Sequence, residues 1–248
     1  MSVTYAAIER ETLRLLSEAS NSTVGEVPDG SGGVTDATSV AIVRAVNLVQ
    51  DWLCRRCVAL RGDGSASIPA ATQSGLAGEV KFSALTMRQT GFRLWCVSDL
   101  WWNGVALRRI DEGVLRLRAP RYSVETADAA THWYERPHDG VFALYPAPRI
   151  TRNVRVAGLC LPPVIVASSP SASQTSTPSF LDDARLMELL PTGCAIYLAK
   201  RLFEDPSVYS RLAHLNKQQG ERVRSLYLSL PAAERERFFS TPPDIEGL

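Results

Sequence analysis

Cys54 and Cys57 are the first side chains in the sequence whose types and spacing suit a chemical site. Two cysteines separated by two residues form half of a tetrahedral zinc site, and the same spacing occurs in redox centres. The sequence contains no second pair with matching spacing, and this pair lies within a predicted helix. We therefore interpret both thiols as small core residues on one face of that helix.

The rest of the sequence lacks the motifs of common catalytic sites. It has no Gly-x-Ser-x-Gly elbow, no Walker-type phosphate loop, no dinucleotide fingerprint and no His-Glu-x-x-His. The three histidines are far apart in the sequence: His132, His138 and His214. Whether one of them acts as a general base stays open. The pair Asp182-Asp183 lies at the start of a predicted helix. Capping of the helix and a favourable interaction with the helix dipole explain this pair. We therefore expect that the protein is not an enzyme and that it binds neither a metal ion nor a cofactor.

Arginine is the most unusual feature of the composition. The chain of 248 residues has 27 Lys and Arg against 26 Asp and Glu, and all but Lys81, Lys200 and Lys217 of the 27 are Arg. Residues 88–155 hold 11 Arg against 7 acids, a charge of +4, whereas residues 1–87 sum to −2 and residues 156–248 to −1. Base composition of the gene is the interpretation we favour for this bias, and forked guanidinium contacts at interfaces or with phosphates are the alternative.

Tryptophans accompany these arginines in the basic middle segment. Aromatic and Arg side chains are favoured anchors of protein interfaces, so we predict that this group contacts other subunits or partners. Two alternatives stay open: the tryptophans fill the core, or the basic segment binds duplex DNA in a salt-sensitive manner. An excess of four charges is modest, which favours the protein interface. The candidate contact residues are Trp95, Trp101, Trp102, Arg108 and Arg109.

The elements that position these residues are helices at both ends of the chain. Apolar residues recur at helical spacing in five segments, and Pro206 and Pro231 suit first-turn positions of two of them. The predicted helices cover 3–19, 36–60, 182–204, 206–228 and 231–239.

Strand patterns occupy the middle of the chain. Runs of branched and aromatic residues are separated by turn pairs such as Asn103-Gly104, Glu112-Gly113 and Asp139-Gly140, with no helix between them. This spacing predicts antiparallel hairpins packed as a small sandwich or curled sheet. Residues 62–78, rich in Gly, Ser and Ala, show no helical periodicity. The predicted strands cover 80–85, 92–97, 114–117, 121–125, 132–135, 141–145 and 154–161.

The fold class that follows is α+β: a helical bundle formed by both ends of the chain, with an antiparallel β-sandwich-like region inserted. The Ser/Thr/Pro-rich loop and the extended tail hold too little apolar surface to pack. No run approaches the roughly 20 apolar residues of a membrane span, the first residues lack a secretion signal, and five scattered cysteines suit a reducing compartment. The predicted divisions are 1–61, 62–166, 167–180, 181–239 and 240–248.

The order of motifs after His132 is the strongest pointer to function. A tryptophan and a polar turn precede a strand that ends in Tyr145-Pro146-x-Pro148, and the strand 154–161 then ends in Pro162-Pro163. A loop, the helix Leu189–Leu202 and a helix pair with Asp205-Pro-Ser and Ala213-His-Leu-Asn-Lys follow. From residue 36 to 230, this order resembles the head-to-tail adaptor (connector, head-completion) proteins of tailed bacteriophages.

The resemblance implies a structural virion protein, made in the host cytoplasm and located in the neck between head and tail. Copies would form a ring, usually of twelve, beneath the portal protein and above tail or nozzle proteins. DNA would pass through the ring without sequence-specific binding, and no membrane would be contacted. The alternative is a tail-tube terminator or another neck protein. The tail would dock into a neighbouring ring, which adds Pro242, Pro243 and Ile245 to the candidate contacts.

Overall fold

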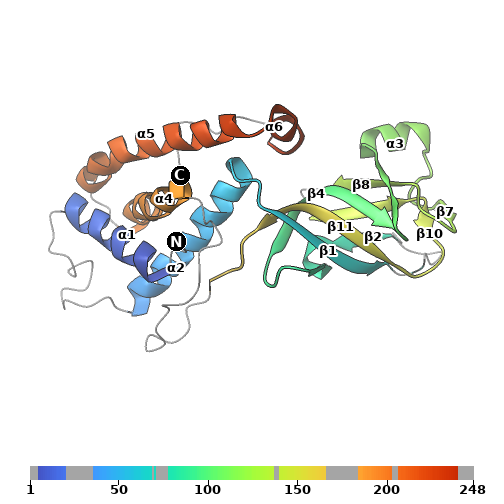
Figure 1. The fold of residues 1–248 in the computed structure, drawn as a ribbon, viewed down its shortest axis with the longest axis horizontal. Coiled ribbons are helices and arrows are strands. Elements are labelled where there is room, and N and C mark those ends of the chain that lie inside the picture. Colours follow the sequence, from blue (N-terminus) through green and yellow to red (C-terminus); the bar gives the residue numbers. More distant parts are fainter. Residues whose placement is uncertain are drawn as a thin grey trace. The chain divides into compact units, whose positions relative to one another are not determined.

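The protein is an α+β protein whose chain divides into two compact units (Figure 1). Met1–Val58 and Val164–Leu248 form the helical unit, and Ala59–Pro163 form the β unit. The computed structural model describes residues 5–20, 36–68, 70, 78–136, 140–165, 184–202 and 206–239. The predicted loop 167–180 and tail 240–248 lie outside the described residues, as do His138, Asp139, Asp182, Asp183, Pro242, Pro243 and Ile245.

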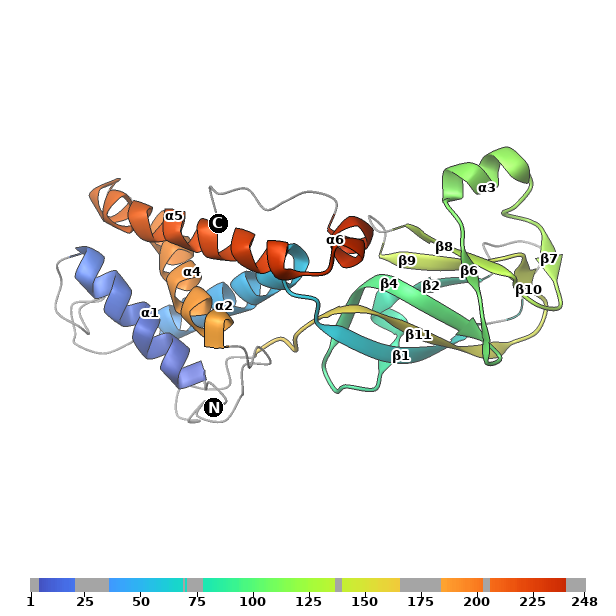
Figure 2. The same ribbon diagram turned by 45° about the horizontal axis from the view of Figure 1, so that its top comes forward.

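The helical unit combines helices from both ends of the chain. Helix α4 contacts α1, α2 and α5, and Figure 2 shows it between α1 and α5. Buried residues lie on all sides of α4 from Leu189 to Ala199, as expected of a central helix. The helices are α1 (Tyr5–Ser20), α2 (Asp36–Arg56), α4 (Ala184–Leu202), α5 (Pro206–Ser229) and α6 (Ala232–Phe238).

The five predicted helices are confirmed, with differences at their ends. α1 buries Tyr5, Ile8 and Leu16 on one face, which is the periodicity that predicted it. α2 ends at Arg56 rather than at residue 60, because the Leu60 carbonyl already accepts a hydrogen bond from Cys160 N at 2.7 Å in the β unit. Pro206 opens α5 as expected, whereas Pro231 is the residue before the first turn of α6.

The β unit contains a five-stranded sheet, a four-stranded sheet and one pair of very short strands. β11 lies at the centre of the five-stranded sheet, antiparallel to β1 on one side and to β4 on the other. The five-stranded sheet has the order β3 (Thr86–Met87), β1 (Arg61–Ile68), β11 (Arg152–Leu161), β4 (Arg93–Trp102) and β5 (Val105–Ala106). The four-stranded sheet has the order β2 (Glu79–Lys81), β9 (Val141–Tyr145), β8 (His132–Arg136) and β6 (Arg108–Arg109), and the pair is β10 (Ala147–Pro148) with β7 (Thr126–Ala127).

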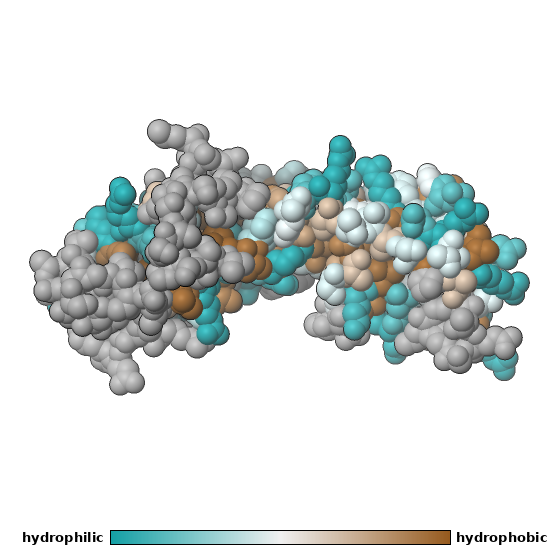
Figure 3. Space-filling view, turned by 90° about the horizontal axis from the view of Figure 1, so that it is seen from below, coloured by the Kyte–Doolittle hydropathy of each residue, from teal (hydrophilic) through white to brown (hydrophobic). Residues whose placement is uncertain are grey.

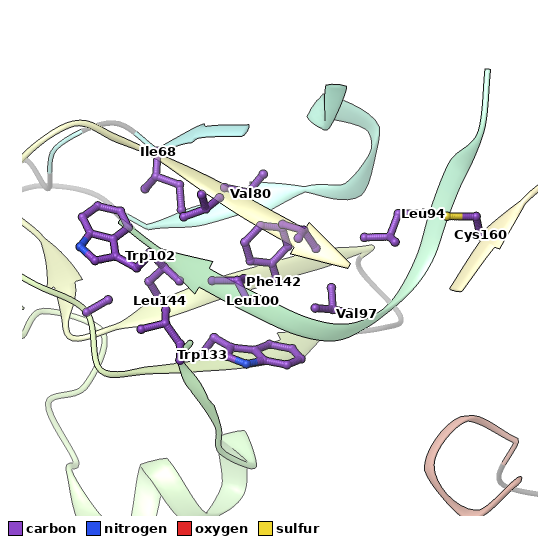
Figure 4. Close-up of a cluster of buried hydrophobic side chains, with 14 residues drawn as sticks. Ile68, Val80, Leu94, Val97, Leu100, Trp102, Trp133, Phe142, Leu144 and Cys160 are labelled. Atoms are coloured by element: carbon purple, nitrogen blue, oxygen red, sulfur yellow. The ribbon is translucent and has the colours of Figure 1, made fainter. Parts of the chain in front are cut away.

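One hydrophobic core joins the two larger sheets (Figure 4). Trp102 and Val156 reach it from the five-stranded sheet, while Trp133, Phe142 and Leu144 reach it from the four-stranded sheet. Trp102 and Val156 alternate with less buried neighbours along their strands, whereas β9 is buried on both faces from Val141 to Leu144. Burial of two tryptophans and a phenylalanine between the sheets is the main hydrophobic stabilisation of this unit.

Two of the strand predictions are wrong, and a third is confirmed only at its start. Val114 to Leu117 belongs to helix α3 (Glu112–Arg118), and residues 121–125 form turns. The predicted turn Glu112-Gly113 is the start of α3, because the Asp111 side chain accepts a hydrogen bond from Val114 N and caps the helix. Of the predicted strand 80–85, only the start lies in β2, and a 3₁₀-helix follows at Phe82–Ala84.

Two further differences concern the strands themselves. β1 occupies part of the Gly/Ser/Ala-rich segment, where strand signals are missing. The strands are not all antiparallel hairpins, because β6 runs parallel to β8 and β7 runs parallel to β10. No helix in the described part of the chain is long and apolar enough to cross a membrane.

Candidate subunit interface

Trp101 and Arg155 lie side by side on the outer face of the five-stranded sheet. Val154 and Val156 of β11 point into the core, so Arg155 between them points outward, and its side chain is 64% exposed. Arg155 is the register partner of Trp101, and its Cζ lies 5.2 Å from the centroid of the Trp101 ring. Its Nη2 lies 3.8 Å from the Asp63 carboxylate on β1. The arginine therefore spans three strands.

The residues around this pair are small or polar. Ser65 on β1 is the register partner of Arg155 and also of Thr86 on β3, and Ala106 on β5 pairs with Trp101. In the space-filling view, hydrophilic, intermediate and hydrophobic residues lie mixed over the β unit (Figure 3). A surface that holds a Trp–Arg pair among small and polar side chains has the chemistry of an interface hot spot. We call this surface the Trp101 face: Asp63, Ser65, Thr86, Trp101, Ala106 and Arg155.

The other two candidate tryptophans lie elsewhere. Trp102 is buried in the core between the sheets, which is the alternative that its sequence left open. Trp95 is half-buried on β4, where the register with β11 shifts between Leu159 and Cys160. A second shift lies between Ala157 and Gly158, and each shift is a β-bulge or irregularity of the ladder. Trp101 is therefore the candidate tryptophan that lies beside Arg155 on the outer face of the five-stranded sheet.

Arg109 neutralises a buried carboxylate. Its Nη2 lies 3.3 Å from Glu135 Oε2, and its Cζ lies 5.4 Å from the ring of Trp133. Glu135 Oε1 accepts a hydrogen bond from Val97 N at 3.1 Å, which links β8 to β4. Burial raises the pKa of Glu135, although the Val97 hydrogen bond and the Arg109 charge oppose that rise. Arg108 is exposed on β6, the edge strand of the four-stranded sheet.

Glu135→Gln is expected to change the free energy of unfolding at pH 7 by no more than about 1 kcal/mol. The amide oxygen still accepts from Val97 N, and removing a buried charge offsets the lost ion pair with Arg109. Glu135→Ala removes the acceptor and is expected to cost about 1–3 kcal/mol. Urea denaturation of both variants checks this, and equal losses in the two would contradict the role given to Val97.

Helix α3 is fixed to the outer face of the four-stranded sheet. Leu115 packs with Tyr134 and Ala143, which point away from the central core. Glu112 Oε1 accepts hydrogen bonds from Arg136 Nη2 at 2.9 Å, from the Tyr122 hydroxyl at 2.7 Å and from Arg116 Nη2 at 3.1 Å. Arg136 Nη1 also binds Glu79 Oε1 at 2.6 Å. Burial opposes ionisation of Glu112, yet these hydrogen bonds lower its pKa to about 2.

The Glu112 network is expected to make stability depend on pH in acid. The pKa of Glu112 is about 2 in the folded protein against an ordinary 4.5, so ionised Glu112 stabilises the fold above about pH 4.5. That contribution is lost as the pH falls from 4.5 towards 2. Glu112→Gln should cost about 1–3 kcal/mol at pH 7 and less at pH 3, where only part of the contribution remains. Denaturant titrations at both pH values check this, and an equal loss at both would exclude the mechanism.

The exposed side of α3 and of the turns after it carries apolar and basic side chains together. Leu117 is 84% exposed, Val124 71% and Val114 38%. Arg118 and Arg121 are exposed beside them and form no ion pair with another described residue. The residue pattern did not indicate this surface, because it predicts strands over 114–117 and 121–125.

The cysteines and histidines do not form a chemical site among the described residues. Cys54 and Cys57 are buried in the helical unit, which confirms their interpretation as core residues. Burial raises the pKa of Cys57 to about 12, so its thiol is protonated at neutral pH. His132 is on β8 and His214 on α5, in different units, and the described residues contain no group of three side chains suited to a metal ion.

Comparison with known proteins assigns the chain to a family. A search of curated proteins found no match. A protein-family model described as SU10 adaptor protein matches residues 3–242. The match spans nearly the whole chain and includes the residues of the Trp101 face, the Glu112 network and both compact units. The chain therefore belongs to the SU10 adaptor protein family, a family of phage adaptor proteins.

Proposed function

We propose that this protein is the head-to-tail adaptor of a tailed phage, which assembles as a ring beneath the portal and connects the capsid to the tail. The family match over both compact units is the observation that carries this proposal. The portal protein above and tail or nozzle proteins below are its partners, and its location is the virion neck. Its role is structural rather than catalytic.

Ring assembly requires two unlike surfaces on every copy, because a contact that closes a ring is heterologous. The Trp101 face supplies one surface with hot-spot chemistry, and the basic, apolar side of α3 lies on the opposite sheet of the same unit. Twelve copies would leave a channel for DNA. A chain with a net charge of +1 has no strong overall attraction for DNA, which favours passage over retention.

The division of the chain also belongs to this proposal. In this proposal the helical parts, 1–61 and 181–239, form one body, and the inserted β region, 62–166, forms another. The segment 167–180 connects the β region to the C-terminal helices. The tail, 240–248, and its residues Pro242, Pro243 and Ile245 serve partner contacts.

Native mass spectrometry of the chain, alone and with purified portal rings, tests the proposal. We expect a complex whose mass corresponds to one ring of this protein on each portal. Binding to the end of a tail tube instead of the portal would replace the proposal with a tail-tube terminator. Salt-sensitive binding to duplex DNA without any portal complex would favour a nucleic-acid-binding protein.

A further inference from the structure

The segment from Asp111 to Glu125 presents apolar side chains on a rigid support. Leu117 and Val124 are the two most exposed large hydrophobic residues among those described, at 84% and 71%. The helix beneath them is held by Leu115 in its own small core and by the Glu112 network. A surface that is already ordered has little conformational entropy to lose on binding. We call residues 111–125 the α3 segment.

Two arginines of the α3 segment can form ion pairs with a partner. All three of its carboxylates have partners within the unit: Asp111 caps α3, Glu112 binds Arg136, and Glu125 accepts from the Tyr145 hydroxyl at 2.5 Å. Arg118 and Arg121 have no ion pair with any described residue. The surface of this segment therefore offers Arg118 and Arg121 for pairing, beside the exposed Leu117 and Val124. Its partner should combine acidic and aliphatic side chains.

The tail of this same chain has that composition. Residues 240–248 read Ser-Thr-Pro-Pro-Asp-Ile-Glu-Gly-Leu, with two acids, no basic residue and the aliphatic side chains Ile245 and Leu248. Pro242 and Pro243 restrict the backbone of the segment before binding, which reduces the entropy that binding costs. Asp244 and Glu246 flank Ile245, so one aliphatic side chain can meet Leu117 while the two carboxylates meet Arg118 and Arg121.

We propose that residues 240–248 of one copy bind to the α3 segment of a second copy. The contact joins two unlike surfaces and therefore suits the ring, so the assignment to a second copy rests on the proposed function. The binding site itself does not depend on it, because the complementarity of the two segments is independent of the portal.

Fluorescence anisotropy with a labelled peptide of residues 240–248 tests the site. The full chain carries Asp244→Arg and Glu246→Arg so that its own tail does not compete. We expect saturable binding that weakens with salt and falls at least 10-fold with Leu117→Ser or with Arg118→Glu and Arg121→Glu. Leu228→Ser on α5, also an exposed leucine at 54%, is the matched control and should bind like the parent chain.

A charge-reversed peptide, with Asp244→Arg and Glu246→Arg, should bind the Arg118→Glu, Arg121→Glu chain more tightly than the parent chain. No saturable binding of the normal peptide, or binding that the α3 variants leave unchanged, would overturn the site. Circular dichroism of each variant confirms that the fold is retained, as expected for side chains this exposed.

A crosslinking experiment then decides which copy is bound. The full chain with a benzophenone amino acid at position 245 is mixed in isotopically heavy and light forms, assembled and irradiated. Crosslinks between heavy and light peptides that map to 111–125 support binding between copies. Crosslinks confined to one copy, or to residues outside 111–125, overturn it. Peptide binding without any portal complex would show that the proposed function fails while the α3 site stands.

Discussion

Gly158→Ala is expected to lower the free energy of unfolding of the β unit by about 3 kcal/mol or more, the upper range for overpacking. A Cβ atom at position 158 would lie 2.1 Å from the carbonyl oxygen of Cys96 and 2.8 Å from Leu94 Cδ1. Both distances are far below van der Waals contact, and the nearer atom belongs to the backbone of the neighbouring strand. The strand therefore has to move, and side-chain rotation does not relieve the clash.

The position of Gly158 explains why the effect should be large. β11 is the central strand of its sheet, and Gly158 adjoins the register shift that follows Ala157. Displacing Cys96 would also displace Val97, whose N–H donates to the buried Glu135. The substitution would thus disturb both sheets through one contact.

Urea denaturation followed by tryptophan fluorescence measures this loss, since four of the five tryptophans belong to the β unit. Gly104→Ala is the matched control: nothing lies within 4 Å of its Cβ position, and its φ of +80° should cost about 1 kcal/mol. Equal stability of Gly158→Ala and the parent chain would contradict the close approach of β11 and β4.

Local patterns were enough to predict the parts of the fold whose hydrophobic period matches their burial. Helix α1 and strands β8, β9 and β11 were expected within two residues of their observed ends. The turn Asn103-Gly104 was also expected, and both residues have positive φ, 49° and 80°, as a tight hairpin turn requires. In each case the sequence signal and the tertiary environment agree.

β1 could not be predicted because its composition is that of a turn. Its strand conformation comes from pairing with β11 along all eight residues, from Arg61 to Ile68. Its small residues fit close neighbours: a Cβ at Gly62 would lie 2.6 Å from Cys160 Sγ, and one at Gly64 would lie 2.8 Å from Met87 Sδ. Tertiary contacts therefore override the weak local preference.

Helix α3 differs from β1, because its sequence does contain a usable helix signal. Asp111 followed by Glu112 is a capping residue with an acid in the first turn, while Arg116 and Arg118 stand in the last turn. Branched Val114 and the leucines suggested a strand instead. The network of Glu112, which joins residues far apart in the sequence, had no local signal.

The sequence predicts which residue types form the candidate interface, but not which of these residues face outward. Trp101 and Trp102 are adjacent and chemically identical, and only the register of β4 decides which one faces outward. Arg155 could not be predicted as a contact residue, because it lies 54 positions after Trp101 in the sequence. It meets the Trp101 ring only through the pairing of β11 with β4. Sheet register is a long-range property, so composition alone does not give it.

Trp101→Ala is expected to prevent ring assembly while leaving the monomer folded. The side chain is half-buried beneath Arg155 on the outer face of the sheet, so its removal leaves the core between the sheets intact. Truncation of a hot-spot tryptophan costs about 2 kcal/mol or more at one interface, roughly a 30-fold loss of affinity. Every copy in a ring repeats the same contact, so the loss recurs at each interface and the closed ring should be absent.

Trp102→Ala provides the comparison that separates an interface from a core. Its side chain lies in the core with Trp133 and Leu144, so we expect a loss of about 3–5 kcal/mol in unfolding free energy. Native mass spectrometry with portal rings and urea denaturation are measured on both variants, with exposed Arg224→Ala on α5 as a surface control. Normal assembly by a folded Trp101→Ala chain would remove the Trp101 face from the ring contact. Unfolding of Trp101→Ala to the same extent as Trp102→Ala would show instead that both tryptophans stabilise the monomer.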